Sequence, residues 1–157
     1  MAAGKSQNHR DPAVTSRIMA AVKNRDTVPE LRLRSELHRR GLRYRLRSKL
    51  PGKPDIVFPR AKVAVFVDGD MWHGHGWRER GFSSMEEQFA QHRDPDFWVA
   101  KIQRNVARDQ EVNQQLKVLG WAVVRVLESE IRRDLTAAAD TVEEAVKIPR
   151  PTASHKL

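Results

Sequence analysis

Residues 50–70 have the sequence LPGKPDIVFPRAKVAVFVDGD. Within this stretch, residues 62–67 form a nearly unbroken apolar run, which is typical of a central strand buried on both faces. Residues 55–58 form a second, shorter apolar segment, and the turn Pro51-Gly52-Lys53-Pro54 precedes it. The stretch therefore predicts two neighbouring strands of one sheet.

Helices are predicted on both sides of these strands in the chain. Helical periodicity and end signals predict four of them, over residues 16–23, 27–40, 94–119 and 134–147. Alternating apolar and basic residues over 42–47 predict a half-exposed strand, and the apolar run 121–126 predicts a buried one. Residues 74–93, rich in Gly, Ser and charge, are interpreted as a long loop. This order predicts an α/β fold, with one mixed sheet flanked by helices.

The chain is expected to form one domain over residues 15–148, between flexible basic tails at 1–14 and 149–157. Its 157 residues include 29 Lys and Arg against 20 Asp and Glu, a formal net charge of +9. Such a charge suits a polyanion, chiefly a nucleic acid, although it also suits a protein that is basic for solubility alone.

The chain contains no cysteine, which excludes disulfides, thiolate nucleophiles and cysteine zinc sites. No apolar run approaches the roughly 18 residues of a membrane span, and the polar N-terminus does not resemble a signal peptide. We therefore expect a cytoplasmic protein with no membrane partner.

Two aspartates mark the ends of the predicted strands. Asp55 begins the shorter strand, and Asp68 directly follows the longer one. Carboxylates on adjacent strand ends can converge on one Mg²⁺, a cation that takes one or two protein carboxylates together with waters and phosphate oxygens. The alternative is that both aspartates only stabilise turns, where Asp is common.

The segment Trp72-His73-Gly74-His75 directly follows these strands. Histidine changes charge near neutral pH, so an imidazole beside a phosphate can act as a general acid or base. The alternatives are a partial metal site and an exposed polar pair.

The long helix predicted over 94–119 has a carboxylate on its apolar face. Asp109 shares that face at helical spacing with Trp98, Ile102, Val106, Asn113 and Leu116. A carboxylate there needs a partner, and an imidazole would gain a fixed orientation from it. We pair Asp109 with His73 as a catalytic dyad. In the alternative, Asp109 lies at the helix edge and meets Arg104 or Arg108.

From about residue 15 to residue 128 the chain resembles the very-short-patch-repair (Vsr) endonucleases, bacterial nickases for thymine–guanine mismatches. This family has the restriction-endonuclease-like fold of the PD-(D/E)XK superfamily, a mixed sheet between layers of helices. The resemblance is carried by ordered segments: residues 19–27 with Glu30, 50–57, 65–73, Phe97-Trp98, Lys101-Ile102, Asn105-Val106, Arg108-Asp109 and 119–121.

The resemblance implies roles for matching positions. Asp55 matches the metal-binding aspartate, and Val67 matches a position that gives its backbone carbonyl to the metal. His73 matches the catalytic histidine, and Asp109 the carboxylate that orients it. Glu30 matches an acidic residue that is placed to hold a metal-bound water.

The resemblance also implies that Met71 and Trp72 form the apolar wedge that enters the base stack beside the mismatch. The basic side chains of Arg43, Arg45, Arg47 and Lys53 are expected to contact DNA phosphates.

The chain departs from the family in two places. Asp68 stands where the family often has a histidine, so one acid or phosphate contact is either missing or replaced; as an alternative, Asp68 joins Asp55 as a metal ligand. The positions of the family's structural zinc hold Asp70, His75, Trp77 and Ser129. An Asp and a His cannot close a tetrahedral site, so we expect no structural zinc, and we expect Trp77 and Phe82 to hold residues 74–93 by packing.

The sequence therefore predicts a monomeric, Mg²⁺-dependent endonuclease that nicks duplex DNA beside a T:G mismatch. We expect it to be associated with the nucleoid and to work with DNA repair proteins. Two alternatives remain open: a restriction-type or modification-dependent DNA endonuclease, and a DNA-binding module without catalysis.

Overall fold

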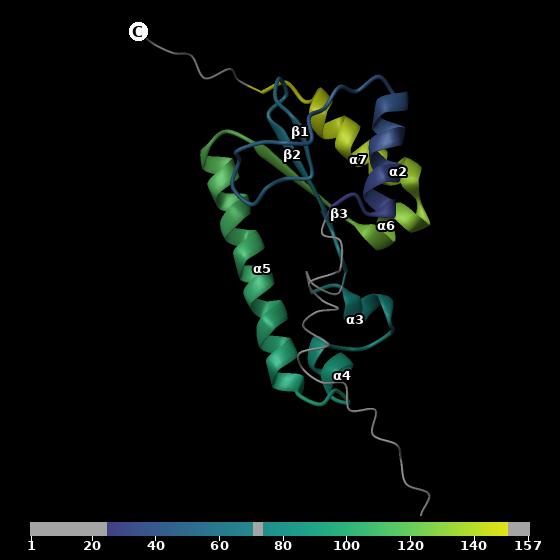
Figure 1. The fold of residues 1–157 in the computed structure, drawn as a ribbon, viewed down its shortest axis with the longest axis vertical. Helices are drawn as coiled ribbons and strands as arrows, with labels where there is room; N and C mark the ends of the chain where they lie inside the picture. The colour runs from purple at the N-terminus through teal and green to yellow at the C-terminus, as the bar shows by residue number, and fades with distance from the viewer. Residues whose placement is uncertain (1–24, 71–73, 151–157) are drawn as a thin grey trace, which may run out of the picture.

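The computed structural model describes residues 25–70 and 74–150. A three-stranded sheet in the order β1-β2-β3 lies at its centre (Figure 1). β2 (Val63–Asp68) pairs antiparallel with β1 (Ile56–Phe58) and parallel with β3 (Ala122–Leu127). β2 is central and almost entirely buried, as its apolar run predicted. The predicted α/β class, with a mixed sheet flanked by helices, is confirmed.

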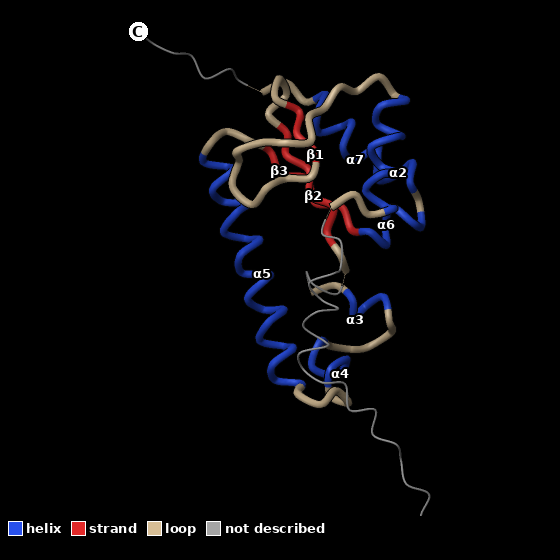
Figure 2. Tube along the Cα trace, in the orientation of Figure 1, coloured by secondary structure: helices blue, strands red, loops and turns tan. Residues whose placement is uncertain are grey.

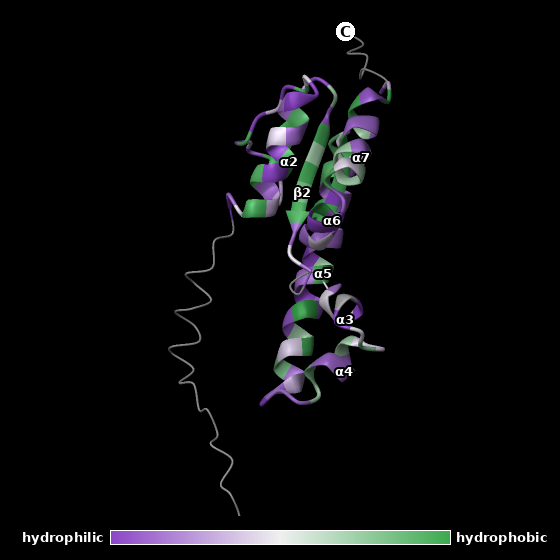
Figure 3. Ribbon diagram, turned by 90° about the vertical axis from the view of Figure 1, so that its right-hand side faces the viewer, coloured by the Kyte–Doolittle hydropathy of each residue, from purple (hydrophilic) through white to green (hydrophobic). Residues whose placement is uncertain are grey.

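One face of the sheet is covered by three helices, α2 (Val28–Arg39), α6 (Glu128–Arg133) and α7 (Leu135–Lys147). Figure 3 shows β2, mostly green along its length, between α2 and α7. The main core lies here and includes Leu33 and Leu37 of α2, Ile131 of α6 and Val142 of α7, all fully buried. The prediction did not include α6, which follows β3 directly and turns the chain back over this face.

The other face is covered by α5 (Pro95–Val118), a helix of 24 residues (Figure 1). The Asp94 side chain caps it by accepting a hydrogen bond of 3.1 Å from the Phe97 N–H. Gly120, at φ +83°, follows its C-terminal end. Leu116 packs against Ala64 and Phe66 of β2. The predicted helix over 94–119 is confirmed.

Two segments differ from the prediction, as Figure 2 shows. The strand expected over 42–47 is reduced to one bridge between Arg45 and Val57. Leu42 and Tyr44 pack against the main core, but residues 45–47 are exposed. The loop expected over 74–93 contains two short helices, α3 (Gly76–Glu79) and α4 (Met85–Phe89).

The anchor of this second segment is Phe89, which the prediction missed. Phe89 is 1% exposed and stacks on Trp98 of α5 with ring centroids 6.2 Å apart. Phe82, one of the two expected anchors, is 36% exposed, and Trp77 is only partly buried. Packing on α5 therefore holds the segment, but through Phe89 rather than through Trp77 and Phe82.

The helix predicted over 16–23, the tail 1–14 and residues 151–157 lie outside the described residues. Within the described parts, no helix combines the length and the apolar character that crossing a bilayer requires.

The turn that leads into Asp55 depends on a close contact with α5. Gly52 has φ +75°, and a Cβ there would lie 2.4 Å from Cγ1 of Val112. We expect Gly52→Ala to lower the free energy of unfolding by about 2 to 3 kcal/mol, from a strained backbone and from a clash with a stiff β-branched side chain. Chemical denaturation measures the loss.

Gly41→Ala is the matched control for this substitution. Gly41 has φ +80°, but a Cβ there meets nothing within 4 Å, so only the backbone cost of about 1 kcal/mol is expected. Equal losses in the two variants would show that the Gly52–Val112 approach does not constrain the turn.

Candidate active site

Asp55 lies at the point where pairing between β1 and β2 ends. Its backbone N–H donates to the Val65 carbonyl at 2.9 Å, and its carboxylate accepts a hydrogen bond of 2.8 Å from the Val67 N–H. The Asp55 side chain thus accepts the hydrogen bond that a backbone carbonyl would have accepted if β1 had been longer.

The backbone carbonyl of Val67 lies at the same edge. Ile56 pairs with Val65 and Phe58 with Val63, and the Asp55 N–H also bonds the Val65 carbonyl, so the regular register ends at Ile56. In an antiparallel ladder, the N–H and the C=O of one residue point to the same neighbouring strand. The Val67 carbonyl is thus on the side where the Val67 N–H meets the Asp55 carboxylate. A carboxylate and a carbonyl therefore meet at one strand end, and both are the hard oxygen donors that Mg²⁺ prefers.

Burial and neighbouring charges perturb the Asp55 carboxyl. Burial is the main cause that raises its pKa from 3.8 to about 6, and the charges of Glu30 and Asp68 raise it further. The Val67 hydrogen bond and the charge of Arg34 lower the pKa. Three acidic side chains thus share one electrostatic environment, where a bound cation would favour the ionised form of Asp55.

These acids do not form a ready-made cage. Among residues 25–70 and 74–150, no group of three or more His, Asp or Glu side chains gathers closely enough to hold a metal ion. Asp55 and the Val67 carbonyl fit a Mg²⁺ that keeps waters and phosphate oxygens as its other ligands.

Glu30 lies in the first turn of α2 and is 2% exposed. Its carboxylate accepts hydrogen bonds from the Arg34 guanidinium and, at 3.1 Å, from the Asp26 N–H. Arg34 also donates to Asp26 at 2.7 Å. The structure thus places Glu30 within electrostatic reach of Asp55, as expected, but already paired with an arginine that our sequence analysis did not identify.

Asp68 and Asp109 are brought together by Arg125 of β3, another residue that we did not identify. Nη1 of Arg125 lies 3.1 and 3.2 Å from the two Asp68 oxygens and 3.5 Å from Oδ1 of Asp109. The alternative interpretation had paired Asp109 with Arg104 or Arg108, but the arginine at Asp109 is Arg125. Arg108 instead donates to Asn105 at 3.2 Å. An arginine inside a predicted buried strand was the available signal, because such a charge needs a partner.

Met71, Trp72 and His73 lie outside the described residues, so the wedge and the His73–Asp109 dyad stay predictions. The chain resumes at Gly74, which lies against α5. A Cβ on Gly74 would be 3.1 Å from Cγ2 of Val106, and Val106 lies one helical turn before Asp109. The residue after His73 is therefore close to the expected partner of that histidine.

Three of the four positions that we compared with the family's structural zinc, Asp70, His75 and Ser129, are joined by hydrogen bonds. The Asp70 carboxylate accepts from the Ser129 hydroxyl and, at 3.2 Å, from the Ser129 N–H. The Asp70 carbonyl accepts from the N–H groups of His75 at 2.9 Å and Gly76 at 2.7 Å. These contacts tie the end of β2 to α3 and to the start of α6.

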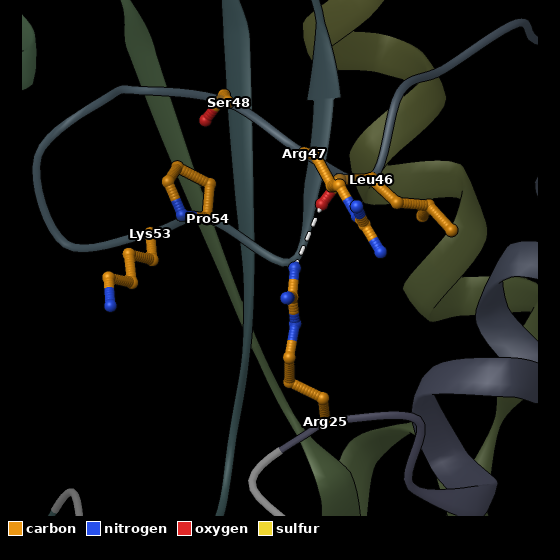
Figure 4. A pocket seen from close by; sticks show the side chains of 6 residues that line it. All are labelled: Arg25, Leu46, Arg47, Ser48, Lys53 and Pro54. Carbon is orange, nitrogen blue, oxygen red and sulfur yellow. Dashed lines mark hydrogen bonds between the residues drawn. The ribbon is translucent and has the colours of Figure 1, made fainter.

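Basic side chains surround a shallow pocket beside the strand ends (Figure 4). The pocket has a volume of about 340 Å³, and its lining consists of Arg25, Leu46, Arg47, Ser48, Lys53 and Pro54. Nη2 of Arg25 donates to the Leu46 carbonyl at 3.1 Å. Arg47 and Lys53 were expected to contact DNA, whereas Arg25 was not identified. Arg43 and Arg45, which were also expected to contact DNA, are exposed but do not line the pocket.

We expect Asp55→Asn to stabilise the metal-free protein at neutral pH. Because the folded-state pKa is raised from 3.8 to about 6, Asp55 lowers the stability as the pH rises from about 4 to about 6, and the full cost is present above about pH 6. The shift corresponds to about 3 kcal/mol, and solvent screening of a partly exposed group makes about 1 to 2 kcal/mol the expected gain. The gain should vanish below about pH 4, because Asp55 is then neutral in both states.

Urea denaturation in the presence of a chelator, at pH 7.5 and at pH 4, measures this difference. A loss of stability at pH 7.5, or a gain that persists at pH 4, would contradict the electrostatic description of Asp55.

Comparison with known proteins relates this chain to a family. The family model for the DNA mismatch endonuclease Vsr matches residues 7–79. The type II nicking enzyme V.NmeDIP of Neisseria meningitidis serogroup C is 42% identical over 137 residues, which cover 87% of this chain and 88% of the relative. The type II nicking enzyme V.HpaIIP of Haemophilus parainfluenzae is 34% identical over 128 residues, 81% of this chain and 86% of the relative. The DNA mismatch endonuclease Vsr of Escherichia coli (strain K12) is 35% identical over 123 residues, 78% of this chain and 74% of the relative. The chain therefore belongs to the Vsr family of DNA mismatch endonucleases and is a DNA endonuclease.

Proposed function

We propose that this endonuclease nicks one strand of duplex DNA beside a T:G mismatch, with Mg²⁺ as its cofactor. The observation that supports the proposal is the hydrogen bond from the Val67 N–H to the Asp55 carboxylate where β1 ends, from which we infer that the Val67 carbonyl faces the same place. The matching family model and the E. coli relative are both named for mismatch endonuclease activity, and other relatives are named nicking enzymes.

The chain's own residues would divide the work of hydrolysis. Asp55 and the Val67 carbonyl would bind the cation, and Glu30 would hold a water close to them. His73 would take the proton of the attacking water, and Asp109 would orient the imidazole. Bound Mg²⁺ would supply Lewis-acid polarisation of the phosphodiester and stabilise charge on the leaving 3′ oxygen.

The basic pocket supports the assignment of DNA as the ligand. Arg25, Arg47 and Lys53 place three cationic side chains around it, and Pro54 joins the pocket to Asp55 in the chain. A backbone phosphate bound here would lie beside the strand ends and place the duplex against the acidic site. Charge of this kind positions DNA without reading its sequence.

Mismatch selectivity would come from the cost of deforming DNA. A wobble pair stacks less well than a Watson–Crick pair, so unstacking at that step costs less. Met71 and Trp72, which lie outside the described residues, are proposed as the wedge that uses this difference. A single nick needs one active site, which agrees with a monomer.

A strand-resolved cleavage assay tests the proposal with duplexes that carry T:G, other mismatches or no mismatch. We expect one nick beside T:G in Mg²⁺ and none with a chelator. Asp55→Ala should lower the rate about 1,000-fold or more, because metal binding is lost. Equal cleavage of the perfect duplex would overturn mismatch specificity, and full activity with the chelator would overturn the metal requirement.

Glu111→Gln is the matched control for Asp55→Ala. Glu111 is an exposed acidic residue of α5, so its removal changes the charge of the protein without touching the strand ends. We expect this variant to nick T:G duplexes at the wild-type rate.

A second experiment tests the basic pocket. Arg47→Gln and Lys53→Gln should each weaken binding to matched and mismatched duplexes alike, and each should reduce the slope of log affinity against log salt by about 1. Fluorescence anisotropy at several salt concentrations measures both quantities.

Lys147→Gln, on α7, removes the same charge from an exposed side chain that pairs with Glu143, and it should leave the slope unchanged. If the pocket variants behaved like this control, the pocket would not be a phosphate site.

A further inference from the structure

Arg125 occupies an unusual place for a charged residue. It lies in β3 between the buried residues Val124 and Val126, and its side chain is 20% exposed. In the parallel register it stands opposite Phe66 of β2, and its guanidinium carbon lies 4.2 Å from the centre of the Phe66 ring. The Phe66 face therefore holds the guanidinium flat against the sheet, on the side that α5 covers.

The hydrogen bonds of this guanidinium link three elements. Nη1 donates to both oxygens of Asp68 at the end of β2. Nε donates to the Asn113 side chain of α5 at 2.8 Å, and Nη2 to the Asp109 carbonyl at 3.4 Å. A planar guanidinium has donors in fixed directions, so these contacts set the position of α5 relative to the strand ends.

Two carboxylates with little access to solvent lie beside Arg125. The Asp68 side chain is 8% exposed and the Asp109 side chain 18% exposed, so both carboxylates are poorly hydrated. Asp68 is also close enough to Asp55 to raise the pKa of that residue. Arg125 is a cation that pairs with Asp68 at this place.

We propose that Arg125 is a positioning residue of the nuclease site, which keeps Asp68 as its own counter-ion and holds Asp109 in place on α5. The proposal rests on the proposed function. It assigns the metal to Asp55 and the Val67 carbonyl, and it gives Asp68 neither of the roles expected from the sequence, metal ligand or acid. Asp68 is instead the anion that anchors Arg125.

Binding of Mn²⁺ alone, followed by electron paramagnetic resonance of the free ion, tests this assignment without DNA or turnover. Asp55→Asn should abolish binding, whereas Asp68→Asn should lower the affinity no more than about tenfold, because it removes no ligand and only leaves the Arg125 charge uncompensated. Arg125→Gln should raise the affinity about tenfold, because the released Asp68 carboxylate then adds its charge to the metal site. Arg125→Lys, which keeps the positive charge beside Asp68, should not show this gain.

The double variant Asp68→Asn/Arg125→Gln separates this effect from a general loosening of the fold. The gain in Mn²⁺ affinity should disappear in it, because no carboxylate remains to be released. Circular dichroism establishes which variants fold. If Arg125→Gln does not fold, the comparison of Asp68→Asn with Asp55→Asn decides the assignment.

Kinetics on mismatched duplexes supply a second readout. Arg125→Gln and Arg125→Lys should lower kcat and leave KM nearly unchanged, because displacement of Asp109 affects the chemical step rather than DNA binding. A rise in KM at constant kcat would overturn the positioning role.

The outcomes distinguish the two proposals. If Asp68→Asn abolishes Mn²⁺ binding as Asp55→Asn does, Asp68 is a ligand and the inference about Arg125 is wrong, while the proposed metal-dependent function stands. If Asp55→Asn binds Mn²⁺ normally, the proposed metal site itself is wrong.

Discussion

The hydrogen bond from the Val67 N–H to the Asp55 carboxylate is the contact on which the rest of the site depends. It forms where the regular β1–β2 ladder ends, directly beyond the pairing of Ile56 with Val65. The same break leaves a side-chain carboxylate and a backbone carbonyl at one edge. The contact with Val112 at Gly52 holds the preceding turn against α5. Strand pairing, turn geometry and helix packing thus converge on the position of one carboxylate.

Charge compensation organises the surroundings of that carboxylate. Glu30 is paired with Arg34, and Asp68 with Arg125, so both acids that influence Asp55 have an arginine partner within the protein. Asp55 receives a backbone N–H and a pKa raised to about 6. An acid that costs stability in the free protein and gains from a bound cation is a common arrangement in active sites. The positive charge of the chain also lies close by, around the pocket that Arg25, Arg47 and Lys53 line.

The sheet and α5 provide the rigid frame, and the shorter elements bring further residues to it. The Asp70–Ser129 contacts attach the end of β2 to α6, and Gly74 rests on α5 beside Val106. The segment that contains Met71, Trp72 and His73 thus has fixed positions at both of its ends. Both neighbours of the proposed wedge and catalytic histidine are therefore attached to well-packed elements, as is frequent for loops that carry function.

Local patterns in the sequence were sufficient to predict β2, α2, α5 and α7, because apolar periodicity, Asp94 as a helix cap and Gly120 after a helix act over a few residues. They also indicated Asp55 as a metal ligand. They overestimated the strand at 42–47, where only the Arg45–Val57 bridge forms, and they missed α6 and the anchor Phe89. Tertiary structure alone decided the partners of the acids. Arg125 meets Asp68 across 57 positions of the chain, and this meeting depends on the parallel register of β2 and β3, which no local pattern encodes.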